Sequence, residues 1–79
     1  MLFNADSLNA FVLTARCGSF AGAAQRLNKV PNAIAYNVHK LEEGLGVPLF
    51  ERQGKQLILT EAGTYFLRRS EMVLEELVD

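Results

Sequence analysis

The chain has 79 residues, 49% of them hydrophobic and 22% charged, with a formal net charge of −1. This length allows one small domain with a thin core, and the apolar fraction excludes an intrinsically disordered chain. No apolar run reaches the roughly 18 residues of a membrane span and the N-terminus lacks a secretory pattern, so we expect a cytoplasmic protein without a membrane partner.

Two short helices are predicted before residue 30. In the first, apolar residues recur at helical spacing between Asn4, a suitable N-cap, and Gly18, which provides a stop. The second begins at Ser19, another capping residue, and makes about two turns. Its small residues, Ala23 and Ala24 among them, allow another helix to approach closely.

The single cysteine, Cys17, falls near the end of the first helix. It cannot form an internal disulfide, and no neighbouring Cys or His would share a metal ion with it. We therefore interpret Cys17 as a small packing residue in a reducing compartment. The sequence predicts no metal site and no cofactor.

A third helix is predicted over residues 31–45. Pro31 suits its first position, where the missing N–H costs nothing, and Gly46 ends it. An apolar stripe must face the core; it consists of Ile34, Val38, Leu41 and Leu45. Because the loop before Pro31 is very short, the second and third helices meet at a corner, which is a helix-turn-helix arrangement.

The outward side of this third helix carries hydrogen-bonding, small and basic groups. Asn32, Tyr36 and His39 lie opposite the apolar stripe, and Ala35 and Lys40 flank them. The segment from Ser7 to Leu41 contains no acid; its basic residues are Arg16, Arg26, Lys29 and Lys40. A helix with such a face fits the major groove of B-DNA, where phosphates would repel a carboxylate. The alternatives are an uneven surface that arose by chance and, for His39, an exposed histidine without a role.

The pattern then changes to two short extended runs within residues 49–59, separated by Gln53, Gly54 and Lys55. We predict a β-hairpin of about four residues per arm, which must lean on the helices because an isolated hairpin is marginal in water. Arg52 and Lys55 flank its tip and are candidates for minor-groove or phosphate contacts, or are simply exposed turn charges. Ser19, at a helix N-terminus, is a further candidate phosphate site.

A long final helix is predicted from Glu61 to about Val78, with Thr60 as its cap. Its apolar residues cover more of the helix than one small core requires. We predict a homodimer contact through this helix, made by Phe66, Val73, Leu74 and Leu77. The alternative is that the surplus covers the hairpin and the first helix.

Taken together, several motifs identify a family resemblance. They are the Leu8/Phe11 spacing, Gly18-Ser19-Phe20, Ala23-Ala24 with Leu27, Leu41-Glu42, LGVPLFER from Leu45 to Arg52, and Leu59-Thr60-Glu61-Ala62-Gly63. At these spacings the chain resembles the N-terminal domain of LysR-type transcriptional regulators. The resemblance implies a mainly α, winged helix-turn-helix fold with three helices, a two-stranded β-hairpin wing and a long C-terminal linker helix.

The resemblance also implies a function and a division of the chain. Residues 1–60 would form the DNA-binding domain and residues 61–79 the linker and dimerisation helix of a cytoplasmic bacterial regulator that binds an inverted repeat as a dimer. Its small-molecule effector would bind a larger C-terminal domain that this chain does not contain. The family uses the positions of Pro31, Asn32, Ala35 and Tyr36 in the recognition helix, and that of Arg52 in the wing, for DNA.

This sequence departs from the commonest pattern of the family at three places. Many relatives have Ser-Gln where this chain has Val30-Pro31, Ser at Ala35, and often Arg at Tyr36. Fewer groups remain here for reading bases, so we expect a different operator, with readout that depends more on apolar contact and DNA shape.

Two other functions fit the residues less well. A winged helix that docks a protein partner would show aromatic or methionine anchors on the third helix, where Tyr36 is the one candidate. An enzyme would need a catalytic constellation, and the chain has one histidine, no metal-spaced cluster and no glycine-rich phosphate loop. We therefore predict no catalytic residue and interpret Glu42 and Glu43 as a solvated face.

Overall fold

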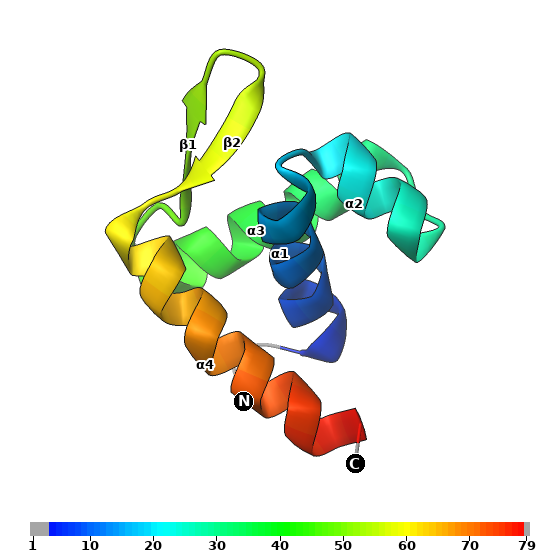
Figure 1. The fold of residues 1–79 in the computed structure, drawn as a ribbon, viewed down its shortest axis with the longest axis vertical. Helices are drawn as coiled ribbons and strands as arrows, with labels where there is room; N and C mark the ends of the chain where they lie inside the picture. Colours follow the sequence, from blue (N-terminus) through cyan, green and yellow to red (C-terminus); the bar gives the residue numbers. More distant parts are fainter. Residues whose placement is uncertain (1–3, 79) are drawn as a thin grey trace.

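The computed structural model describes the backbone of residues 4–78 and the side chains of residues 4–75. Three helices are followed by a hairpin and a fourth helix (Figure 1). The elements are α1 (Ala5–Cys17), α2 (Phe20–Leu27), α3 (Pro31–Leu45), β1 (Phe50–Gln53), β2 (Gln56–Leu59) and α4 (Glu61–Val78). This order confirms the predicted mainly α, winged helix-turn-helix fold.

Side chains cap three of the helices as expected. The Asn4 Oδ1 atom accepts the N–H of Ser7 at 2.8 Å, and the hydroxyls of Ser19 and Thr60 each accept the N–H three residues ahead at 3.0 Å. The stops are also local, because Gly18 and Gly46 both have φ of 75°, the left-handed region that favours glycine. Each capping group satisfies a backbone N–H or C=O that the helix itself leaves unpaired.

The core lies around α1. Phe11 is fully buried, with its ring centroid 5.4 Å from that of Phe50 and 5.3 Å from that of Phe66. The first residue of the wing and the first half of α4 therefore pack on the same side chain of α1. On the other side, Ala23 and Ala24 are buried and allow α2 to lie close to its neighbours.

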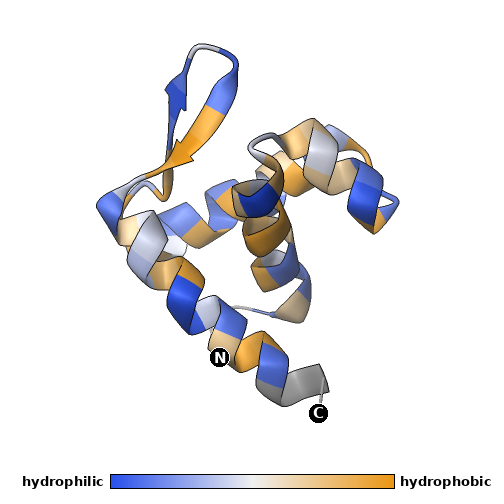
Figure 2. Cartoon of the chain, in the orientation of Figure 1, coloured by the Kyte–Doolittle hydropathy of each residue, from blue (hydrophilic) through white to orange (hydrophobic). Residues whose placement is uncertain are grey.

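The two strands pair antiparallel, with Phe50 opposite Leu59 and Arg52 opposite Leu57. The hairpin projects from the helical body, and the C-terminal end of α4 lies at the opposite end of the molecule (Figure 1). Figure 2 shows that β1 is largely hydrophilic and β2 largely hydrophobic. β2 packs against α1 and α4, and the N–H of Leu57 donates to the carbonyl of Gly18 at 3.0 Å, so β2 fastens the wing to the end of α1.

Candidate nucleic-acid interface

The position of α3 follows from its own sequence. Pro31 occupies the first turn after Val30, which supplies the N-cap position without a side-chain hydrogen bond. Ile34, Val38 and Leu41 are at most 1% exposed and hold the inner side of the helix in the core. The opposite side of α3 is therefore turned to solvent.

The outward residues lie where the sequence predicted. Asn32, Tyr36, His39 and Lys40 are exposed, with Tyr36 at 63%, and Ala35 is half-buried beside them. Lys29 and Pro31 are exposed at the entrance to the helix. Residues 31–40 include no carboxylate, so this face of α3 offers hydrogen-bonding, apolar and basic groups to a partner.

His39 is held in place on this face. Its Nδ1 lies 3.1 Å from the Glu42 Oε1 atom, and its ring centroid is 6.0 Å from that of Phe20, edge to face. Because Nδ1 is engaged by the carboxylate, Nε2 is the ring nitrogen that remains for a contact with a phosphate.

Glu42 does not belong to a solvated face, and that interpretation was wrong. Its side chain is only 19% exposed, whereas that of Glu43 is 71% exposed and lies 3.6 Å from Lys40. The Glu42 Oε2 atom accepts the N–H of Leu49 at 2.7 Å and that of Phe50 at 3.4 Å. The sequence contained part of this information. The loop after α3 is short and passes through Pro48, which has no N–H, so the next backbone N–H groups come back to the end of α3. The spacing alone did not show whether Glu42 or Glu43 would accept these N–H groups.

Ser19 and the wing supply the remaining predicted contacts. The Ser19 side chain is half-buried and its hydroxyl oxygen accepts the N–H of Gly22, so the hydroxyl works as a cap at the start of α2. Arg52 and Lys55 are exposed, one in β1 and one in the turn. Arg52 also lines a small hollow of about 210 Å³ between the wing and α3, together with His39 and Glu42.

The region rich in basic residues is narrower than the sequence indicated. Arg16, counted among its basic residues, lies 2.9 Å from Glu71 and joins α1 to α4. This pair crosses 55 positions of sequence, so charge segregation along the chain did not reveal it. Lys29, Lys40, Arg52 and Lys55 remain as the basic side chains of the predicted interface.

The apolar residues of α4 divide between two surroundings. Phe66 and Leu74 pack against the core of this chain. Some of the extra apolar residues of α4 therefore cover α1, which was the alternative to a dimer contact. Val73 is 37% exposed, and Tyr65 and Met72 are exposed at 66% and 58%. Leu77 lies beyond the residues whose side chains are described. The dimer contact therefore stays a prediction. Among its predicted residues whose side chains are described, Val73 is the exposed one.

Within the described residues, no group of three or more His, Cys, Asp or Glu side chains is placed to hold a metal ion. Cys17 is half-buried at the last position of α1, and its Sγ lies near Gly22, a small residue at the start of α2. Over the same part of the chain, no helix combines the length and hydropathy needed to cross a membrane.

Comparisons with known proteins agree with this geometry. Residues 5–64 match the model of a family described as bacterial regulatory helix-turn-helix protein, lysR family. The chain is 46% identical over 71 residues to the HTH-type transcriptional regulator PunR of Escherichia coli K12. These residues make up 90% of this chain and 23% of PunR. The chain thus spans about a quarter of the length of PunR and of CrgA of Neisseria meningitidis, to which it is 40% identical over 77 residues.

Several solved structures with similar folds are complexes with DNA. The CbnR_DBD-DNA complex superposes with a TM-score of 0.87 at 36% identity, over 91% of this chain and 83% of that one. The BenM_DBD/benA site 1 DNA complex gives a TM-score of 0.89 at 27% identity, over 95% and 84%.

Proposed function

Because this chain belongs to the LysR family of bacterial regulatory helix-turn-helix proteins, we propose that it reads double-stranded DNA by sequence. In this proposal α3, residues 31–45, lies in the major groove and the wing, about residues 49–59, contacts the flanking groove or backbone. Residues 1–60 form the DNA-binding domain and residues 61–79 the linker and dimerisation helix. The family is one of regulators, so no chemistry on a substrate is assigned to this chain.

One observation carries the proposal: the outward face of α3 is exposed and free of carboxylates over residues 31–40. A major groove about 12 Å wide accepts an α-helix, and phosphates line both of its edges. The buried Ile34, Val38 and Leu41 leave this face as the side that can enter the groove. The similar structures that are complexes with DNA support DNA as the partner of this face.

The chemistry of each side chain suggests its contact. The Asn32 amide can pair with an adenine edge, and Tyr36 can contact a thymine methyl or a phosphate. Pro31 and Ala35 permit a close approach of the helix to the bases. Basic side chains and the N–H groups at the start of a helix can hold a phosphate without reading sequence. Phosphate contacts are therefore assigned to Ser19, Lys29, His39, Lys40, Arg52 and Lys55.

We also propose that the protein acts as a homodimer through α4 on an inverted repeat. A second copy would cover the exposed side of α4 that carries Tyr65, Met72 and Val73. The symmetry of such a dimer requires a palindromic site. In this proposal, a small-molecule effector would bind the remaining part of a longer regulator, which corresponds to the length of the relatives that this chain does not match. The regulator would work in the cytoplasm, and the DNA-binding domain would need no cofactor.

Selection from random duplex DNA, followed by salt titration of the recovered site, tests the function. We expect an inverted repeat, and an affinity whose log–log salt slope is about −0.9 per phosphate contact. Lys40→Ala and Arg52→Ala should each make the slope shallower by about one contact. Arg16→Ala is the control, because the Arg16 side chain joins α1 to α4 and belongs neither to α3 nor to the wing. Binding that is insensitive to salt, or no enriched duplex, would contradict the proposal.

A further inference from the structure

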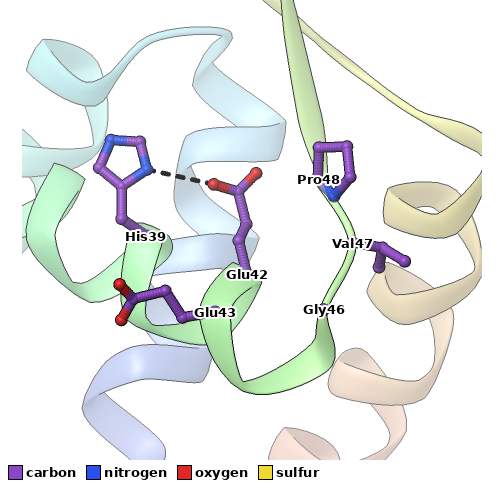
Figure 3. A pocket seen from close by; sticks show the side chains of 6 residues that line it. All are labelled: His39, Glu42, Glu43, Gly46, Val47 and Pro48. Carbon is purple, nitrogen blue, oxygen red and sulfur yellow. Dashed lines mark hydrogen bonds and ion pairs between the residues drawn. The ribbon is translucent and has the colours of Figure 1, made fainter.

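The Glu42 carboxylate lies at the junction of the recognition helix and the wing. Its Oε2 atom accepts the N–H groups of Leu49 and Phe50 at 2.7 and 3.4 Å. Its Oε1 atom lies 3.1 Å from His39 Nδ1, a contact that Figure 3 shows. One side chain of α3 thus joins a residue of the DNA-facing surface to the first strand of the wing.

The N–H of Leu49 has a particular need for this acceptor. The β1–β2 ladder begins one residue later, at Phe50 opposite Leu59, and the Leu49 side chain is fully buried. A buried N–H without an acceptor is costly, and a carboxylate forms stronger hydrogen bonds than a neutral group. The hydrogen bonds to Glu42 therefore fix where the chain leaves α3 and enters β1.

The other anchors of the wing lead to different elements. The N–H of Leu57 donates to the carbonyl of Gly18 at the end of α1. The N–H of Thr60, the residue before α4, donates to the carbonyl of Leu49, the residue before β1. Arg52 faces the same small hollow as His39 and Glu42. Among the hydrogen bonds of the described residues, those that Glu42 accepts from Leu49 and Phe50 join α3 to the start of β1.

We propose that Glu42 is a positioning residue that sets the wing relative to the recognition helix, so that Arg52 and the outward face of α3 engage one DNA site together. Glu42 acts through Leu49, Phe50 and His39 and does not touch DNA. This inference rests on the proposed function for its consequence in DNA binding, but the position of the wing can be measured without DNA.

The chain offers a matched control for the test. Glu42→Ala and Glu43→Ala each remove one negative charge from adjacent positions of α3, but only Glu42 accepts the wing N–H groups. Residual dipolar couplings of the ¹⁵N-labelled 79-residue chain report the orientation of residues 50–59 relative to α3. We expect a changed or averaged orientation in Glu42→Ala and the wild-type orientation in Glu43→Ala. An unchanged orientation in Glu42→Ala would overturn the proposal.

Two further measurements apply if Glu42→Ala fails to fold. Glu42→Gln keeps an acceptor in place without the charge, and we expect its wing orientation to lie closer to wild type. In the wild-type chain, scalar coupling across the hydrogen bond from the Leu49 nitrogen to the Glu42 carboxylate carbon should be detectable. Absence of this coupling in the wild-type chain would overturn the role of the carboxylate.

A double-mutant cycle on the selected duplex tests the consequence for DNA. We expect Arg52→Ala to weaken binding about 5-fold in the wild-type background and less than about 2-fold in Glu42→Ala, because a misplaced wing no longer makes the contact. A loss of global stability alone would leave the effect of Arg52→Ala unchanged, and that result would overturn the proposal. If no duplex binds the wild-type chain, the DNA function fails, while the dipolar couplings still decide the role of Glu42.

Discussion

Replacement of Gly63 by alanine tests the packing of α4 most directly. Gly63 is buried in the first turn of this helix, against the backbone of Leu49. An added Cβ would lie 2.9 Å from Leu59 Cδ2 and 3.0 Å from the Leu49 carbonyl carbon, and closer still to the Leu49 oxygen. That oxygen already accepts the N–H of Thr60 at 3.0 Å. The start of α4 and the loop before the wing must therefore move apart.

The expected magnitude is a balance of three effects. Overpacking costs about 1–3 kcal/mol, and weakening of the hydrogen bond from Thr60 to Leu49 costs about 1 kcal/mol. Alanine is the better helix former by about 1 kcal/mol, which opposes these losses. We expect Gly63→Ala to lower the free energy of unfolding by about 2 kcal/mol, a fall in Tm of roughly 8–16 °C for a domain of this size.

Gly44→Ala is the matched control, because Gly44 lies inside α3 on an exposed position. There the same substitution should stabilise the domain by up to about 1 kcal/mol. Urea and thermal unfolding followed by circular dichroism give both values. If Gly63→Ala were as stable as the wild-type chain, the close approach of α4 to Leu49 would be refuted.

Three further substitutions separate other features of the fold. Among the described residues, the Thr14 hydroxyl is buried without a hydrogen-bond partner, so Thr14→Val should raise stability by about 1 kcal/mol; a loss in urea unfolding would reveal a bonded hydroxyl. Arg16→Ala should cost at most about 1 kcal/mol, because the pair with Glu71 is exposed, and a larger cost in the same assay would contradict this. Val73→Asp should shift a dimer to monomer in sedimentation without loss of helix signal, whereas an unchanged mass would exclude the exposed side of α4 as the contact.

The sequence by itself determined the elements and their ends. The side chains of Asn4, Ser19 and Thr60 accept N–H groups of the first turns that follow them. Pro31 stands where a helix leaves the N–H unpaired, and Gly18 ends α1 through its own backbone. These effects are local, so residue type and spacing are sufficient to predict them. The outward face of α3 was predictable for the same reason, because helical periodicity fixes which residues oppose a buried stripe.

Only the tertiary structure decided which distant groups meet. Glu42 and Glu43 are neighbours in sequence, yet only Glu42 meets the returning backbone at Leu49. Arg16 pairs with Glu71, which lies 55 positions away in the sequence, and Phe66 packs on Phe11 in this chain. The physical reason is the same for these three contacts. The partner of a side chain depends on where the chain folds back, and this cannot be predicted from residue type or helical periodicity.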